Sequence, residues 1–411
     1  MCNPKHHKHL GRHSLFHHQS SFAMFKIFLV TAFLTPFSFA CQQSPKINAV
    51  NPPAQFISQT AGTEKSKIQV ALLLDVSNSM DGLIDQAKAQ LWKMVNRLAD
   101  AKRQNEGVEL EIALYEYGSD DLEAATGFIR LLHPLSTDLD GLSEKLFVLK
   151  TNGGEEYCGW VIKTSLSEIP WSNNSNDLKI IIIAGNEPFN QGPVDFRTSC
   201  GTAADRGIIV NTIHCGDHQT GVNTEWKTGA DIGKGKYMII DTGKKVVHIN
   251  TPYDTRIIEC NERLNRTYIG YGSEGEAKKE RQVAQDVNAS SYGSANMAKR
   301  AAAKSKDAYK NDDWDLVDAA EADEKFVENI KTESLPVGLK GKSKAEITKE
   351  IERLKTERQA VRKELADLEK QMSAFIAEET KKQGAGETTL DNVLIQAVVD
   401  QAKLKGFIFG D

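Results

Sequence analysis

The stretch Val70–Gly82, which reads VALLLDVSNSMDG, joins an apolar segment to a turn rich in side-chain oxygens. Residues 68–74 are almost all apolar, as in a strand that is buried on both faces of a parallel sheet. Asp75, Ser77 and Ser79 follow at alternate positions. Open α/β sheets bind ligands at the carboxyl ends of their strands, and oxygen ligands suit a hard divalent cation, so the pattern predicts a metal site. The alternative is that these residues only cap the next helix.

Strands and helices alternate over residues 66–272, which we expect to form one domain. The expected strands cover residues 68–74, 108–117, 128–132, 178–184, 207–213 and 237–240. The expected helices cover residues 83–103, 139–149, 157–169, 195–205, 224–232 and 254–271. This order predicts an α/β fold with a doubly wound, mainly parallel sheet and helices on both faces.

The remainder of the chain has a helical pattern. We expect a helical region at 273–340, a coiled-coil segment at 341–383, and a C-terminal helix with a short tail at 384–411. A heptad seam runs through Ile347, Ile351, Leu354, Arg358, Val361, Leu365, Leu368, Met372 and Phe375. It predicts either a self-associating coiled coil, and so a homo-oligomer, or a helical hairpin packed on its own chain. In the hairpin, the C-terminal helix is the expected return arm.

The first residues have the pattern of an export signal. We interpret 1–40 as a leader whose true start is Met24, because a lysine, an apolar run and a small-x-small site follow that methionine. Cys41 comes directly after this site, which predicts a lipid anchor, with simple cleavage as the alternative. Residues 41–65 are expected to form a flexible tether. We therefore expect a bacterial protein in the periplasm or on an outer or cell-surface membrane.

The charge and cysteine content narrow the functional classes. The chain has 51 basic and 56 acidic residues, a balance that gives no reason to expect a nucleic-acid partner. Four cysteines follow the expected leader and anchor, and an even number in an oxidising compartment predicts two disulfides of unknown pairing. These candidates are Cys158, Cys200, Cys215 and Cys260. No combination of nucleophile, base and orienting group is recognisable, so we expect no enzymatic activity.

The segment Asp75-x-Ser77-x-Ser79 after a buried strand resembles the von Willebrand factor A domain over about half of the chain. The resemblance implies a Rossmann-like domain with a metal-ion-dependent adhesion site. In that family the two serines bind Mg²⁺, the aspartate orients a metal-bound water or a serine, and a partner's carboxylate fills the open position. The segments AGNEPFNQGP, VNTIHCG and NDDWDLVDA are also similar to a group of exported bacterial proteins with this domain.

Two other loops depart from the family pattern. The family's second loop supplies a threonine after a glycine pair, and here Glu155 takes that place, with Thr151 as a rival. The third loop usually supplies an aspartate, which is missing, so we expect Glu187 or Asn186 to substitute through water. The expected ion is Mg²⁺, with Mn²⁺ or Ca²⁺ as alternatives.

The sequence leaves two functional hypotheses open. The first is an exported, membrane-tethered module that binds a protein or peptide with an acidic group through this metal site. The second is a structural or assembly scaffold with a degenerate metal site, which oligomerises through the coiled coil.

Overall fold

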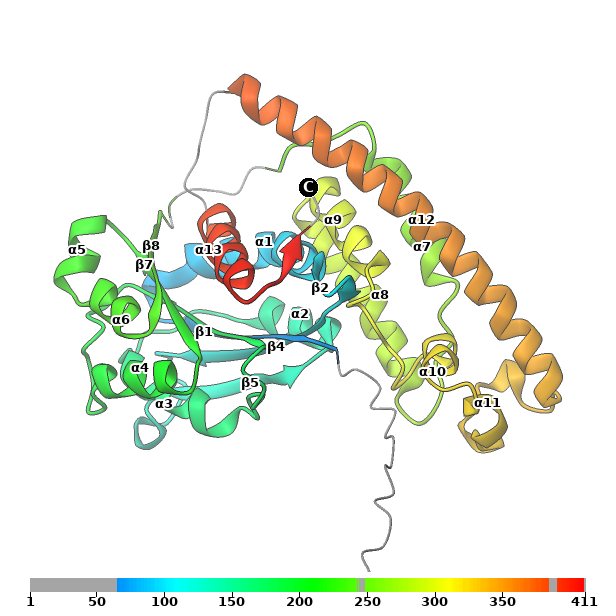
Figure 1. Ribbon diagram of the computed structural model, residues 1–411, viewed down its shortest axis with the longest axis horizontal. Coiled ribbons are helices and arrows are strands. Elements are labelled where there is room, and N and C mark those ends of the chain that lie inside the picture. Colours follow the sequence, from blue (N-terminus) through cyan, green and yellow to red (C-terminus); the bar gives the residue numbers. More distant parts are fainter. Residues whose placement is uncertain (1–64, 242, 244–247, 384–389, 410–411) are drawn as a thin grey trace, which may run out of the picture. The chain divides into compact units, whose positions relative to one another are not determined.

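Six strands form one sheet in the computed structural model, which describes residues 65–241, 243, 248–383 and 390–409 (Figure 1). The strand order is β5-β4-β1-β6-β7-β8, and all neighbours are parallel except β4 and β5. The predicted doubly wound, mainly parallel α/β fold is therefore confirmed. The strands are β1 (Lys67–Asp75), β4 (Glu109–Tyr117), β5 (Ile129–Ser136), β6 (Leu178–Gly185), β7 (Ile209–Cys215) and β8 (Lys234–Ile240).

Helices cover both faces of this sheet, as the apolar central strands require. All of β6, and all of β1 after Lys67, is buried. One face packs against α3 (Cys158–Glu168), α4 (Phe196–Asp205) and α6 (Trp226–Ile232), beside the short α5 (His218–Asn223). The other face packs against α1 (Asp81–Ala99), α2 (Leu139–Val148) and α13 (Leu390–Leu404).

The helix expected at 83–103 is shorter than predicted. It ends at Ala99, and the chain then forms a small hairpin of β2 (Ala101–Arg103) and β3 (Glu106–Gly107). Gln104 and Asn105 make the turn, both with positive φ, which is the geometry of a tight two-residue hairpin.

The end of the chain returns to the sheet domain. Helix α13 packs on α1 and β8, and β9 (Ile408–Phe409) pairs with β2. The side chains of Asn211 and Gln401 exchange two buried hydrogen bonds, of 2.9 and 2.7 Å, which fix α13 against β7. The expectation that the C-terminal helix is the return arm of a hairpin with the preceding helix is wrong, because its apolar face is buried on the sheet domain instead.

The intervening helices are therefore an insertion between β8 and α13. They are α7 (Asp254–Asn265), α8 (Gly275–Ser291), α9 (Ser294–Ser305), α10 (Leu316–Ala322), α11 (Phe326–Asn329) and α12 (Lys344–Gln383). Helix α9 packs on α1, and α7, α8 and α12 pack on α9. Arg300 of α9 is fully buried and pairs with Asp140 of α2 at 2.8 Å, so the insertion is tied to the domain by charge as well as by apolar contacts.

The heptad seam lies on α12 and packs within the chain. Its buried members contact the helices that precede α12, and Phe375 packs edge-on to Tyr253. The buried members are Ile347, Ile351, Leu354, Arg358, Val361, Leu365 and Met372. The structure thus shows the intramolecular alternative for this seam, with α7, α9, α10 and α11 as the partners instead of a second copy.

Arg358, the polar member of the seam, holds α12 in place. Its guanidinium pairs with Asp315 at 2.8 Å and with Asp318, and it donates to the backbone oxygen of Thr267 at 2.7 Å. It also lies 4.1 Å from the centre of the Tyr268 ring. A buried arginine with all these partners needs a fixed position, so it sets the register of α12 on α10.

The four predicted disulfide cysteines are free thiols. Cys158, Cys200, Cys215 and Cys260 are all buried, on α3, α4, β7 and α7 respectively. The disulfide prediction is wrong because each thiol fills an apolar site in the core, where cysteine packs as a small hydrophobic residue. The leader, Met24 and Cys41 lie outside the described residues. Within the described part, no helix is both long enough and apolar enough to cross a membrane.

Replacing Arg358 with alanine is expected to lower the free energy of unfolding by about 3–5 kcal/mol, because Asp315 and Asp318 are left buried without their cation. The matched control is Arg353→Ala on the same helix, whose exposed ion pairs are screened by solvent and contribute little to stability. Urea denaturation measures both values. Equal losses in the two variants would contradict the role given to Arg358.

Candidate metal centre

The carboxyl end of β1 carries a buried aspartate with one free oxygen. Asp75 is 0% exposed, and its Oδ1 accepts a 2.7 Å hydrogen bond from the backbone N–H of Ser77. Its Oδ2 is buried and has no hydrogen-bond partner among the described residues. A buried carboxylate oxygen without a partner is costly, so this atom points to a missing cation or proton.

The two predicted serines converge on the same place. The Oγ atoms of Ser77 and Ser79 are 3.2 Å apart, and the Ser79 hydroxyl donates to Oδ1 of Asn186 at 3.2 Å. The loops after β1 and β6 therefore meet at this point. Asn186 is half-buried at the cluster, whereas Glu187 is exposed but close enough for its charge to act on Asp75.

The second loop contributes Glu156 rather than either predicted residue. Glu156 is buried, and its carboxyl group interacts with the Ser77 side chain. Glu155 is exposed and accepts from Nε2 of Gln191 at 3.1 Å, while Thr151 donates to Asp81. The buried carboxyl group thus belongs to the residue after the predicted Glu155, because neighbouring side chains in extended backbone point in opposite directions. The buried Cys158 two residues later shares the inward direction, and this alternation was the signal available in the sequence.

Two glycines let these carboxylates approach. Gly118 has φ of +83°, and a Cβ there would stand 2.9 Å from Cγ of Glu156 and 3.1 Å from Oδ1 of Asp75. Gly154, from the glycine pair noted in the sequence, passes so close to the carbonyl group of Gly118 that any side chain would collide with it. The loops after β4 and before α3 therefore close around the two acids.

The electrostatics of the two buried acids, Asp75 and Glu156, favour the binding of a positive charge. Burial raises the pKa of Asp75 to about 7. Burial, with the negative charge of Asp75 next in importance, raises the pKa of Glu156 to about 8. Both groups ionise more readily if a cation binds between them.

The donor set fits a hard divalent ion. It comprises the carboxylates of Asp75 and Glu156, the hydroxyls of Ser77 and Ser79, and the amide oxygen of Asn186, all of them oxygens of the kind that Mg²⁺, Mn²⁺ or Ca²⁺ accepts. In the part of the chain that the structure describes, no three His, Cys, Asp or Glu side chains are grouped as a metal site. An ion here would therefore depend on hydroxyl groups and water in addition to the two acids.

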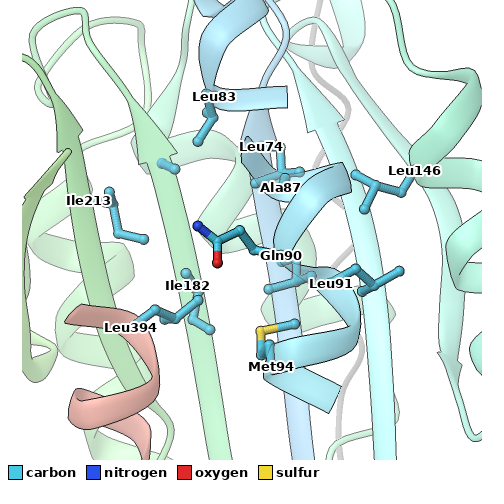
Figure 2. Close-up of a pocket in the computed structure, with 12 residues that line it drawn as sticks. Leu74, Leu83, Ala87, Gln90, Leu91, Met94, Leu146, Ile182, Ile213 and Leu394 are labelled. Carbon is cyan, nitrogen blue, oxygen red and sulfur yellow. The ribbon is translucent and has the colours of Figure 1, made fainter. Parts of the chain in front are cut away.

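An apolar cavity of about 40 Å³ lies beneath this edge, between the sheet and helices α1 and α13 (Figure 2). Gln90 is the single polar side chain in its lining, so the cavity has too few polar partners to hold water or a charged ligand. The polar edge above it is the better candidate site. The lining residues are Leu72, Leu74, Leu83, Ala87, Gln90, Leu91, Met94, Leu146, Ile182, Ala184, Ile213 and Leu394.

The doubly wound sheet and the oxygen cluster at the end of β1 are what the family resemblance implies. The architecture of the sheet domain is therefore consistent with that resemblance. The strand order reverses around β1, which has β4 on one side and β6 on the other, so the cluster occupies the switch point where open α/β sheets bind ligands.

Comparisons with known proteins add no functional assignment. No model of a protein family matches the chain, and no curated protein matches it. One similar solved structure is the conserved hypothetical protein BatB from Bacteroides thetaiotaomicron, at 16% identity over 42% of this chain and 90% of that chain, with a TM-score of 0.33. Another is the vWF domain of the type V pili tip protein Mfa5 from Porphyromonas gingivalis, at 13% identity over 44% and 91%, with a TM-score of 0.32.

A third similar solved structure is proximal thread matrix protein 1 from the mussel byssus, which has a zinc-occupied MIDAS motif, that is, a metal-ion-dependent adhesion site. It is 13% identical over 44% of this chain and 43% of that chain, with a TM-score of 0.34. At these identities and TM-scores, nothing that these proteins bind is transferred to this chain.

The sheet domain is expected to lose stability as the pH rises from about 4 to about 8 when metal is absent. The raised pKa values of Asp75 and Glu156 mean that the folded form holds more protons than the unfolded form in this window, so each ionisation favours unfolding. Across the window we expect a loss of roughly 2 kcal/mol or more. Saturating Mg²⁺ should remove most of it, because the ion replaces the protons.

Urea denaturation at several pH values, with EDTA or with Mg²⁺, measures this effect. Glu156→Gln is the informative variant, because it removes one of the two titrating groups and should flatten the pH dependence without metal. A pH dependence that is the same with EDTA and with Mg²⁺ would contradict the assignment of the site.

Proposed function

We propose that this protein is an exported binding module whose A domain captures a protein or peptide partner through a divalent cation. The observation that carries the proposal is the unpartnered Oδ2 of Asp75, which is buried beside Ser77, Ser79 and Glu156 at the ligand-binding edge of the sheet. Asp75 and Glu156 would supply negative charge, and Ser77, Ser79 and Asn186 would supply neutral oxygens. The ion, when bound, offers a partner an open coordination position.

An acidic group of the partner is the proposed ligand at that open position. The family resemblance implies a neutral threonine from the second loop, whereas this loop brings the carboxyl group of Glu156 to the cluster, so the charge balance here differs. Asp75 and Glu156 together would neutralise a divalent ion, and Glu187 adds a further negative charge nearby. The metal alone therefore attracts a carboxylate less strongly than a site built from hydroxyls does, and the partner needs further contacts beside the metal.

The proposed location follows from the N-terminal sequence. Export through the leader at 1–40 and attachment through Cys41 would place the A domain at the end of the tether at 41–65, outside the cytoplasm. A membrane-tethered domain with an open ligand edge suits capture of another protein.

The scaffold alternative depends on self-association. It is weaker in its original form because the seam on α12 is already buried on the chain's own helices. The mass of the native protein in solution tests it independently of metal. A stable oligomer would restore the scaffold alternative and require a contact surface other than the seam.

Metal titration of the protein without its leader is the direct test of the site. Calorimetry with Mn²⁺ and Mg²⁺ is expected to show binding near one equivalent, which Asp75→Ala abolishes and Ser77→Ala weakens by about tenfold or more, a loss of about 1.4 kcal/mol. Glu156→Gln should weaken binding clearly, and the same change at the exposed Glu155 should have a far smaller effect. Thr151→Val tests the rival residue of the second loop, whose hydroxyl bonds to Asp81 rather than to a member of the cluster, and it should have a far smaller effect.

Circular dichroism shows whether each variant is folded before its binding is compared. Metal binding that survives in a folded Asp75→Ala variant would place the ion elsewhere and overturn the proposal. The absence of any heat and of any metal-induced stabilisation in the unaltered protein would also overturn it.

A further inference from the structure

The amino end of the sheet, opposite the candidate metal centre, carries cations grouped around one loop. The loop covers residues 172–177 and leads into β6. Arg103 of β2 and Lys405, which follows α13, donate to backbone oxygens of this loop at 3.4 and 2.9 Å. Lys179 of β6 donates to a third at 2.9 Å, and also to the backbone oxygen of Arg206 at 3.1 Å. Segments that are far apart in the sequence thus bring four cations together.

These four cations are held by neutral groups. The guanidinium of Arg206 donates to the backbone oxygen of Leu166, and the other three donate to the carbonyl groups just described. Among the residues that the structure describes, none of the four has an ion-pair partner. Burial, with the positive charges of Lys405 and Arg206 next in importance, lowers the pKa of Lys179. Carbonyl groups fix the cations in position without cancelling their charge, so positive charge accumulates at this end.

Two exposed apolar side chains lie beside the cations. Leu404 ends α13 directly before Lys405 and is 88% exposed. Ile408 of β9 is 55% exposed and lies opposite the exposed Lys102 of β2, so both side chains are on the outer face of the small sheet. Gly406, with φ of +80°, makes the turn that joins α13 to β9. We call the exposed surface formed by these residues the basic face: Lys102, Arg103, Arg206, Leu404, Lys405 and Ile408.

Acidic residues also occur at this end of the sheet, but they do not cancel the cations. Asp177 is buried in the loop, and Asp205 and Glu106 are exposed, each adjacent to a cation of the basic face in the chain or in the hairpin. Two further acids, at the start of β4, pair with Lys67. Together with Lys179, the basic face holds five cations against the first three acids, so its net charge is positive.

The basic face lies where the expected tether, 41–65, joins the sheet domain. The backbone N–H of Lys67, the first residue of β1, donates to Oδ1 of Asp177 in the same loop at 2.9 Å. Asp75, at the other end of β1, belongs to the candidate metal centre and lies roughly 25 Å away along the strand. That end is acidic, with Glu155 and Glu187 exposed. The two ends of the sheet therefore differ in the sign of their charge.

We propose that the basic face docks on the surface of an anionic phospholipid membrane, the one that holds the tether. The inference rests on the export and attachment in the proposed function, and it is independent of the metal. Negatively charged headgroups attract lysine and arginine side chains, and exposed leucine and isoleucine side chains gain by entering the boundary between headgroups and acyl chains. The long apolar stems of lysine and arginine let their charged ends stay among the headgroups.

Attachment of the chain favours a lipid surface over a soluble acidic protein. A domain anchored through Cys41 stays near the membrane, because residues 41–64 span at most about 80 Å even when extended. Tethering makes the second contact intramolecular, so a weak contact is sufficient. Docking through the basic face also has a consequence for the proposed function. The acidic end of the sheet, with the metal centre, would point away from the anionic surface and towards a partner.

Vesicle sedimentation tests this inference with the protein that lacks its leader and carries Cys41→Ser, so that no lipid is attached. Vesicles of phosphatidylcholine alone are compared with vesicles of phosphatidylcholine and phosphatidylglycerol in equal parts, with EDTA at low salt. We expect the anionic vesicles to bind the protein at least about tenfold more tightly than the neutral ones. Most of this difference should disappear at a salt concentration of about 1 M, where charges are screened within about 3 Å.

The decisive variant combines Lys102→Gln with Leu404→Ser, which removes one charge and one apolar side chain from the basic face. Both side chains are exposed, so the fold should remain intact, and circular dichroism checks this. Binding to the anionic vesicles is expected to weaken about tenfold. The matched control combines Lys363→Gln with Val337→Ser, two equally exposed positions in the helical insertion, and it should bind like the unaltered protein.

Three results would overturn the inference. The first is equal binding to neutral and anionic vesicles, or no binding to the anionic ones. The second is an equal loss in the decisive variant and its control. The third is tighter binding to polyglutamate than to the anionic vesicles, which would assign the basic face to an acidic protein. Because EDTA is present throughout, failure of the docking leaves the metal centre unaffected, and failure of the metal titration leaves the docking result valid.

Discussion

The burial of the Asp75 carboxyl group at the end of β1 is the constraint on which the candidate site depends. Helices cover β1 on both faces, so the strand delivers its last side chain into a place that water does not reach. Burial disfavours the ionised form of Asp75, and the negative charge of Glu187 raises its pKa further. The serine hydroxyls, the Asn186 amide and the glycine-lined loops are arranged around that one unfavourable charge, which a bound cation would relieve.

The same sheet constrains the rest of the chain. On the face that carries α1 and α2, the chain covers β8 with α13, which follows the whole helical insertion. The insertion is therefore held at both ends by the domain that it interrupts. Buried ion pairs fix its geometry, with Arg300 joining α9 to α2 and Arg358 joining α12 to α10. Such pairs contribute more to a unique arrangement than to net stability.

Charge distinguishes this sheet domain from the pattern that its sequence resembles. A site built from neutral hydroxyls leaves a bound divalent ion with excess positive charge, and under the proposed function the Glu156 carboxylate would remove that excess. Recognition of a partner would then be shared with the surface around the ion.

The sequence by itself determined the sheet and the first part of the site, because both depend on local patterns. The apolar runs of β1 and β6 required burial on both faces, and Asp75, Ser77 and Ser79 follow β1 within one short loop. Only the tertiary structure decided what depends on distant packing. It selected Glu156 over Glu155, since the direction of a loop side chain is fixed by the loops around it. It kept four cysteines as thiols, which pack in pairs into the two hydrophobic clusters that flank the sheet. It placed α13 on α1 and α12 on α7, since an apolar helical face does not specify which surface will cover it.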